Sequence, residues 1–194
     1  MKKTGLFFGS FNPIHIGHLI LANYILENSD MDELWFVVSP QNPFKEKKSL
    51  LKDHNRLDMV QLAVKNYSKM RASNVEFSLP TPSYTIDTLT HLKEKYPDHS
   101  FSLIMGEDNL AGLKKWKNSD LLVQNHHIIV YPRVFANKTS EKEYFQHENI
   151  SVIKAPVIEL SATEIRMMIK EGKNVRPMLP PEVFEYLDGS NFYR

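Results

Sequence analysis

The 194-residue chain contains no cysteine. That absence excludes disulfide bonds, thiolate metal sites and cysteine nucleophiles, and it fits a cytoplasmic protein. An excess of one charge is lacking too, because 24 Lys and Arg face 23 Asp and Glu, for a formal net charge of +1. Without a general basic field we expect no nucleic-acid partner, and local groups must hold any anionic ligand.

Long apolar runs are also missing, and no stretch approaches the roughly 20 apolar residues of a membrane span. The start, MKKTGLFFGSF, superficially resembles a signal peptide, but Gly9 and Ser10 break its apolar run. We interpret it as a buried first strand and expect no membrane partner. The length and the globular composition, with 42% hydrophobic residues, favour a single domain over residues 1–194. Its C-terminal helices, from about residue 161, are expected to pack on the rest.

Apolar runs that suit buried strands alternate with segments of helical periodicity. We expect strands at residues 4–8, 33–38, 74–77, 101–105, 128–131 and 152–153, and helices at 16–26, 53–66, 86–96, 110–122, 161–171 and 181–187. This alternation predicts an α/β fold, a Rossmann-like open and mostly parallel sheet with helices on both faces. Such sheets bind ligands outside the carboxyl ends of their strands, and the unusual segments of this chain follow strands.

The segment GSFNPIHIGH follows the first expected strand. Gly9 permits a tight turn, and His15 and His18 share one face at the start of a helix. Helix N-termini attract anions, and Gly17 would leave room for a phosphate between the two imidazoles. Two other interpretations stay open: ordinary polar residues on an exposed first turn, or a histidine pair that binds a metal ion. The pattern favours the anion site.

The segment LSATEIR follows the last expected strand and begins with Ser-x-x-Glu, which is typical of a helix capping box. Capping does not explain Thr163 or Arg166. An arginine near a helix N-terminus opposes the helix dipole, and an anionic ligand would remove that conflict. The segment therefore also predicts phosphate recognition by Arg166.

Both segments resemble signatures of the nucleotidyltransferase superfamily, which includes adenylyl- and cytidylyltransferases. GSFNPIHIGH has the form G-x-F-x-P-x-H-x-G-H, and SATEIR has the form S-x-T-x-I-R. Class I aminoacyl-tRNA synthetases share H-I-G-H but are much larger. The resemblance implies catalytic roles for His15, His18 and Arg166. It also implies ATP contacts from Gly9, Ser10, Phe11, Ser161 and Thr163.

Three further segments, PQNPFK, TPSYTIDTL and LIMGEDNLAGLKKW, resemble the bacterial nicotinate-mononucleotide adenylyltransferases. The resemblance implies that Lys45, Gly106, Asp108 and Arg133 contact ATP, and that Tyr84, Thr85 and Trp116 surround a pyridine ring. Each also has an ordinary structural interpretation, such as a core aromatic, a helix cap or a solvated charge. The chain departs from the common pattern at Phe44, where many members have histidine, and at Glu107, where they have alanine.

The family reaction transfers AMP from ATP to nicotinate mononucleotide, giving the deamido dinucleotide and pyrophosphate. Mg²⁺ would arrive with ATP, without a metal site built by the protein alone. The alternatives are a sister enzyme that uses nicotinamide mononucleotide or phosphopantetheine, and a non-catalytic nucleotide-binding module. Phosphopantetheine-dependent relatives typically carry threonine at the first histidine, so His15 argues against that acceptor. Assembly into a homo-oligomer stays open at this stage.

Overall fold

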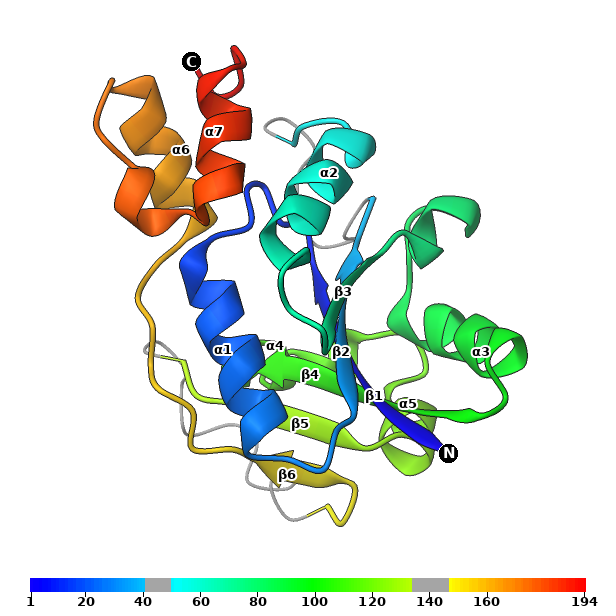
Figure 1. Ribbon diagram of the computed structural model, residues 1–194. Coiled ribbons are helices and arrows are strands. Elements are labelled where there is room, and N and C mark those ends of the chain that lie inside the picture. Colours follow the sequence, from blue (N-terminus) through cyan, green and yellow to red (C-terminus); the bar gives the residue numbers. More distant parts are fainter. Residues whose placement is uncertain (41–49, 134–146) are drawn as a thin grey trace.

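The structure, a computed structural model, describes residues 1–40, 50–133 and 147–194 (Figure 1). Its strands are β1 (Lys2–Gly9), β2 (Glu33–Val38), β3 (Met70–Ser73), β4 (His99–Gly106), β5 (Ile128–Tyr131) and β6 (Ile150–Val152). Its α-helices are α1 (Ile16–Glu27), α2 (Asp53–Val64), α3 (Thr85–Lys95), α4 (Glu107–Leu110), α5 (Ser119–Asn125), α6 (Ala162–Lys170) and α7 (Pro181–Asp188). Short 3₁₀ helices are η2 (Val75–Ser78), η3 (Leu113–Lys115) and η5 (Arg176–Met178).

The six strands form one sheet in the order β3-β2-β1-β4-β5-β6, and each neighbouring pair is parallel. The chain leaves β1 toward one edge of the sheet and later returns to build the other half from β4. The strand order therefore reverses between β1 and β4, and their carboxyl ends border a crevice. The predicted Rossmann-like α/β fold is confirmed, and the register sets Gly9 beside Val38 and Gly106 beside Tyr131.

Side chains along each strand alternate between two hydrophobic cores, one on each face of the sheet. Phe7 and Phe36 point into the core that α1, α2 and α7 cover. Leu6 and Trp35, one residue earlier in each strand, point into the core that α3 and α5 cover. Figure 1 shows α1 and α2 on the opposite side of the sheet from α3. Helices on both faces are thus confirmed.

Two predicted elements are wrong in detail. The third strand is Met70–Ser73, and the predicted residues 74–77 lie mostly in η2. The predicted helix at 110–122 is interrupted, because it consists of the end of α4, the short η3 and most of α5. Asn118 lies between η3 and α5 with φ 52°, in the left-handed region, so a continuous helix cannot pass through it.

The C-terminal helices α6 and α7 lie side by side in Figure 1 and share the first core. Ile165, Val183 and Leu187 are almost wholly buried in the same cluster as Phe7, and α7 packs against α2. This places the start of α6 near the carboxyl end of β1. Among all helices of the described ranges, none is both long and apolar enough to span the bilayer.

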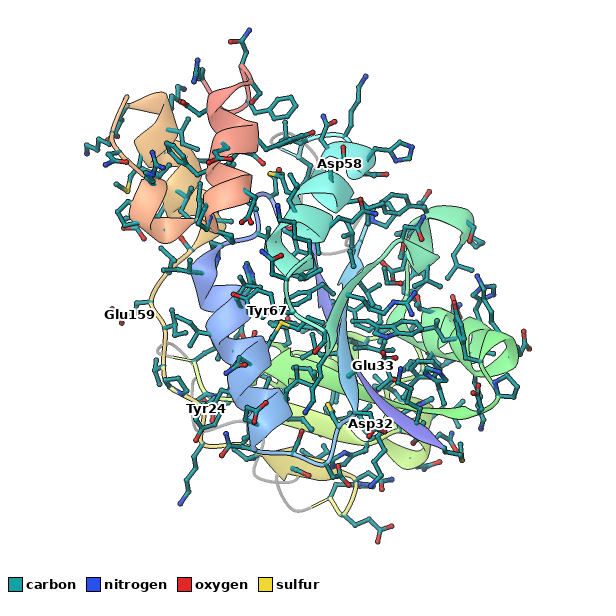
Figure 2. All side chains as sticks on the ribbon, in the orientation of Figure 1. Tyr24, Asp32, Glu33, Asp58, Tyr67 and Glu159 are labelled. Atoms are coloured by element: carbon teal, nitrogen blue, oxygen red, sulfur yellow. The ribbon has the colours of Figure 1, made fainter. Side chains whose placement is uncertain are left out.

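At the amino ends of the strands, polar side chains pair with one another. Oε1 of Glu33 accepts hydrogen bonds from Trp35 Nε1 (2.7 Å) and Thr4 Oγ1 (3.3 Å), and Oε2 pairs with Lys2 Nζ (2.7 Å). The Thr4 hydroxyl also contacts His99 Nδ1 at 2.9 Å. Figure 2 shows Glu33 with Asp32 near the N-terminal end of β1, far from α6 and α7. Both carboxylate oxygens of Glu33 are therefore satisfied within the protein.

Candidate active site

A cavity of about 470 Å³ opens at the carboxyl ends of β1 and β4. It brings together thirteen predicted site residues: Gly9, Ser10, Phe11, His15, His18, Tyr84, Thr85, Asp108, Trp116, Arg133, Ser161, Thr163 and Arg166. Gly106 ends β4 beside this lining. Lys45 and Phe44 fall outside the described residues. The polar segments that follow separate strands therefore meet in one space, as the topology predicts.

The loop after β1 has a strained backbone that is held by a buried aromatic ring. Phe11 has φ 46°, in the left-handed region, although it is not glycine. Its ring is 2% exposed and makes edge contacts with Phe7, Phe36 and His18. A Cβ on Gly9 would approach this ring to 2.7 Å, closer than real Cβ contacts come. Gly9 is thus required by the close approach of the Phe11 ring.

The two histidines stack at the start of α1. Their ring centroids are 3.7 Å apart with a 30° tilt. The His15 N–H donates to Nδ1 of His18 at 3.2 Å, so a neutral His18 carries its proton on Nε2. His15 is the N-cap of α1, and its carbonyl accepts the His18 N–H at 3.0 Å. The N–H groups of Ile16 and Gly17, the first two of α1, have no acceptor inside the helix and lie beside the pair. This arrangement supplies an imidazole donor and helix amides to the cavity.

Burial, and next the positive charge of Arg133, lower the pKa of His15 to about 4, so its imidazole is neutral near pH 7. The side chain is 5% exposed. A Cβ on Gly17 would meet the His15 ring at 3.0 Å and Ile158 at 3.1 Å. The missing Cβ of Gly17 therefore makes room for the His15 ring, and Gly17 lines the cavity, so the expected room for a phosphate between the imidazoles stays a prediction.

Arg166 extends from α6 to the loop after β1. Its Nη1 donates to the carbonyl of Asn12 at 2.8 Å, and Nη2 donates to Thr163 Oγ1 at 3.3 Å. The Ser161 hydroxyl caps α6 by accepting the Glu164 N–H at 3.1 Å. Both expected features of LSATEIR are therefore present, a cap and an arginine at the cavity wall, and the arginine also connects α6 to the first loop.

Asn12 is a site residue that the sequence analysis missed. It is 2% exposed, and its side-chain Oδ1 accepts hydrogen bonds from Tyr193 Oη (2.6 Å) and the Leu51 N–H (3.2 Å). Together with the bond from Arg166, these contacts connect the first loop to three segments that are distant in sequence. The Asn-Pro pair in GSFNP is the only signal for Asn12 within the motif itself, but the hydrogen-bond partners of Asn12 are visible only in the fold.

Arg56 is the second missed residue and is fully buried. Its guanidinium donates to the carbonyls of Ser10 (2.6 Å), Ser39 (2.9 Å) and Leu51 (3.1 Å), and to Asp53 Oδ1 (2.6 Å). Asp53 is 42% exposed, so most of the compensation comes from carbonyl dipoles. Arg56 thereby fixes the loop after β1 against the residues after β2.

On the opposite side of the crevice, Gly106 lies beneath Asp108 and Arg133. A Cβ on Gly106 would collide with Asp108 Oδ1 and come within 3.1 Å of Arg133 Cγ. Arg133 Nε lies 3.7 Å from Asp108 Oδ1 with both side chains part-exposed, and its Nη2 contacts Tyr131 Oη at 3.4 Å. Such an exposed pair is weak and can exchange partners with a ligand.

The predicted acceptor residues are half-buried on the remaining wall, and Trp116 also packs against the second core. Tyr84 is the N-cap of α3 and Thr85 its first residue, so the first N–H groups of α3 lie there without intrahelical partners. Trp116 lines the same wall after η3. Lys117 Nζ lies 5.0 Å from the centre of the Tyr84 ring and pairs with Asp87 at 2.8 Å. The wall thus combines aromatic rings with backbone donors.

Three buried side-chain atoms in the described ranges have no hydrogen-bond partner: Nδ1 of His15, Oε2 of Glu76 and Oγ of Ser83. All three residues line this cavity. Buried polar atoms are rarely left unpaired unless a ligand or water completes them. Glu76 and Ser83 were not predicted as site residues.

Among the described residues that line the cavity, Asp108 and the buried Glu76 carry carboxyl groups. Three have basic side chains: Lys117, Arg133 and Arg166. Within the described ranges, no group of three or more His, Asp or Glu side chains is arranged to hold a metal ion. Asp108 alone offers a part-exposed carboxylate, which suits a Mg²⁺ ion that keeps most of its bonds to phosphates and water.

Comparison with known proteins identifies the family. The cytidylyltransferase-like family model matches residues 6–168. A probable nicotinate-nucleotide adenylyltransferase from Flavobacterium johnsoniae is 55% identical over 192 residues, 99% of either chain. One from Bacteroides thetaiotaomicron is 45% identical over 95% of this chain and 90% of that relative.

Among solved structures, the Plasmodium falciparum nicotinic acid mononucleotide adenylyltransferase complexed with NaAD superposes with a TM-score of 0.81. The alignment covers 100% of this chain and 98% of that one, and at 23% identity it supports the fold. The fold, the family model and the full-length relatives agree. The chain belongs to the cytidylyltransferase-like family and, within it, to the nicotinate-nucleotide adenylyltransferases.

Proposed function

We propose that the chain transfers AMP from Mg²⁺-ATP to nicotinate mononucleotide, producing nicotinate adenine dinucleotide and pyrophosphate. A phosphate oxygen of the mononucleotide attacks the α-phosphorus of ATP and forms a new P–O bond. The bond from that phosphorus to the bridging oxygen breaks, and pyrophosphate leaves with the electron pair. The attacking oxygen is ionised near neutral pH, so the step needs no general base and no covalent enzyme intermediate.

One observation carries the proposal: a single cavity has phosphate-binding donors at one end and an aromatic, donor-lined wall at the other. At the first end, His18 Nε2–H, the α1 amides and Arg166 would stabilise charge on the reacting phosphates. Neutral His15 would hold the triphosphate without adding charge. Gly9, Ser10, Phe11, Ser161 and Thr163 would line the ATP site. Lys45, outside the described residues, stays a prediction.

Across the crevice, Asp108, Arg133 and Gly106 would hold the ATP ribose and phosphates. Mg²⁺ would enter as part of the ATP substrate, with Asp108 as its protein ligand, and would withdraw charge from the phosphates. Because Arg133 lies 3.7 Å from Asp108, ligand binding can separate the pair and free both groups. These residues therefore position ATP, and catalysis follows from orientation and charge stabilisation.

At the other end, Tyr84 and Trp116 would stack on the pyridine ring, while Thr85 and the first N–H groups of α3 would face its substituent. A carboxylate there accepts hydrogen bonds only, whereas an amide directs its own N–H groups at some of these donors. Each unpaired buried donor costs about 1–3 kcal/mol. This difference predicts a preference for nicotinate over nicotinamide mononucleotide.

The test measures pyrophosphate release with Mg²⁺-ATP and each of nicotinate mononucleotide, nicotinamide mononucleotide and phosphopantetheine. We expect the highest kcat/KM with nicotinate mononucleotide, by about tenfold or more over the amide. Trp116→Ala should raise KM for both pyridine mononucleotides equally. Equal kcat/KM for acid and amide, or a preference for the amide, would contradict the assigned acceptor.

We further propose that residues 1–194 act as one nucleotidyltransferase unit in the cytoplasm. The start of α6 completes the phosphate end of the cavity through Arg166, which supports treating the C-terminal helices as part of that unit. The near-neutral net charge supports a reaction on mononucleotides without a nucleic-acid partner.

A further inference from the structure

Glu76 is a carboxyl that lies almost wholly inside the protein beside the acceptor end of the cavity. It is 2% exposed and belongs to the short helix η2. Its Oε1 accepts a hydrogen bond from Thr88 Oγ1 at 2.8 Å, and Thr88 is fully buried in the first turn of α3. The same hydroxyl lies 3.3 Å from the carbonyl of Tyr84, the N-cap of α3. Glu76 is thus connected to the N-terminus of α3 through one hydroxyl.

The second oxygen of Glu76 has a different environment. Oε2 is buried and unpaired within the part of the chain that the structure describes, and so is Oγ of Ser83. Ser83 stands two residues before Thr85, in the turn that leads into α3. Burial raises the pKa of Glu76, and hydrogen bonding from nearby hydroxyls, that of Thr88 first, offsets only part of that rise. A neutral carboxyl can donate from one oxygen and accept on the other, which suits this set of hydroxyls.

The charge of Glu76 matters because the acceptor proposed for this cavity is itself anionic. Two carboxylates in one poorly solvated site disfavour each other's ionised form. Arg56, which donates to the Ser39 carbonyl, and His54, whose ring stacks on Phe77 at 5.6 Å, are the other ionisable groups near η2. Neither makes a hydrogen bond to the Glu76 carboxyl. Burial raises the pKa of Glu76 and so favours its uncharged form, and in that form the side chain does not repel an anionic acceptor.

We propose that Glu76 is a positioning residue for the acceptor. Its side chain joins the turn at residues 81–84 to the first turn of α3. This inference rests on the proposed function and deepens it. By holding the Thr88 hydroxyl, which also lies near the Tyr84 carbonyl, Glu76 aims Thr85 and the first N–H groups of α3 at the substituent of the pyridine ring. Its side chain lies at the start of α3 on the acceptor side of the cavity, so its influence falls on acceptor affinity and on the choice between acid and amide.

Four variants test this role: Glu76→Ala, Glu76→Gln, Thr88→Val and the control Thr90→Val. Glutamine keeps the shape of the side chain without its ionisable group, and its carbonyl still accepts from Thr88. Thr88→Val removes the bond to Glu76 and leaves the carboxyl in place. Thr90 lies on the same helix, is exposed and donates to the Ile86 carbonyl, so its replacement makes the same chemical change away from Glu76.

For each variant, KM for nicotinate mononucleotide, nicotinamide mononucleotide and ATP is measured together with kcat and Tm. Glu76→Ala and Thr88→Val should raise KM for nicotinate mononucleotide by about threefold to tenfold, the value of one hydrogen bond. KM for ATP and kcat should change by less than about twofold, and the preference for acid over amide should narrow. Glu76→Gln should recover most of the acceptor affinity, and Thr90→Val should match the parent.

A parallel rise of all three KM values, together with a fall of kcat in step with Tm, would overturn the proposal, since it would show a purely structural carboxyl. So would acceptor KM values in Thr88→Val equal to those in Thr90→Val. If Glu76→Ala does not fold, Thr88→Val and Glu76→Gln decide the outcome alone. Failure of the proposed function is seen separately, because the parent itself would then release no pyrophosphate with nicotinate mononucleotide.

Discussion

The two ends of the sheet differ in how far their buried polar atoms are paired by hydrogen bonds. At the amino ends of the strands, Glu33 receives hydrogen bonds from Trp35 and Thr4 and an ion pair from Lys2. At the carboxyl ends, atoms of His15, Glu76 and Ser83 are buried without partners. Paired polar groups contribute to stability, whereas unpaired ones weaken it unless a ligand completes them. The difference indicates which end evolved for binding.

The largest expected effect separates activity from stability at the carboxyl end. His18→Ala removes a donor aimed at the reacting phosphates, which typically lowers kcat by about 10²–10³-fold. Because the ring lines the cavity and is not in the core, Tm should move little. Steady-state kinetics and thermal melts measure the two effects. The matched control is His91→Ala on α3, which lies outside the lining; near-normal turnover in His18→Ala would exclude the catalytic role.

Arg56 is an exception to this difference between the two ends, because its buried guanidinium lies at the carboxyl ends of the strands and is hydrogen-bonded within the protein. Arg56→Lys keeps the charge but cannot reach the carbonyls of Ser10, Ser39 and Leu51 together. We expect a loss of about 3 kcal/mol or more in unfolding free energy, as for other broken buried charge networks. Denaturant titration measures it against Arg71→Lys, an exposed arginine over Trp35. Equal stability of the two variants would show that Arg56 does not fix the loop.

His15 predicts how acid affects the folded state. Its pKa is about 4 in the folded protein against about 6.5 when unfolded, so between these values the unfolded chain binds more protons. Stability should therefore be unaffected by His15 above pH 6.5 and should fall by up to about 3 kcal/mol as pH falls to 4. Unfolding free energies across this range should decline more steeply for the parent than for His15→Gln. His91→Gln keeps His15 and should follow the parent; identical slopes for all three proteins would refute the assignment.

A smaller effect tests the amino ends of the strands, where the Glu33 carboxylate is paired. Glu33→Ala leaves the Trp35 and Thr4 donors without their buried acceptor, at about 1–3 kcal/mol in unfolding free energy. Turnover at a temperature where the variant is folded should stay within about twofold of the parent, since the cluster lies at the far end of the strands. Asp32→Ala, at the adjacent residue, is the control for a local loss of charge. If Glu33→Ala lowered kcat without lowering stability, the amino ends of the strands would have a role in catalysis and the difference between the two ends would be refuted.

The smallest expected effect concerns Arg166, which lines the cavity and also makes a hydrogen bond within the protein. Arg166→Ala should raise KM for ATP by about tenfold, the value of a charge-assisted hydrogen bond, and Arg166→Lys should recover part of it. Its bond to the Asn12 carbonyl means that the alanine variant should also be slightly less stable, not more stable as the helix dipole alone suggests. ATP titrations and melts measure the two changes. Unchanged ATP use in both variants would make Arg166 a structural residue only.

Much of the fold was predictable because the central strands carry uninterrupted apolar runs such as ELWFVV. The third strand was misplaced for a physical reason. β3 is the edge strand and reads Met-Arg-Ala-Ser, with one face partly open to solvent, so it lacks an apolar signature. The alternating Val-Glu-Phe at residues 75–77 resembles a strand, but it lies in η2, which buries Val75 without pairing it to a strand.

Thirteen predicted site residues line one cavity, with Gly106 beside it, because their motifs are local and follow strands. Arg56, Asn12 and Glu76 were missed because a buried polar residue has the same letter as an exposed one. Their partners lie up to 181 residues away, as with Asn12 and Tyr193. Only the fold shows that Arg56, in a helix with charged neighbours, points inward.

The Phe11 ring lies where a side chain on Gly9 would be, and this makes the two positions mutationally dependent on each other. A residue in the left-handed region costs roughly 1–3 kcal/mol unless it is glycine, and at Phe11 the buried ring offsets that cost. Phe11→Gly would relax the backbone but empty the core, and Gly9→Ala would displace the ring. Neither substitution improves the loop alone, and the effect of one depends on the other. Sequence change in this loop should therefore be epistatic, with viable replacements arising as pairs.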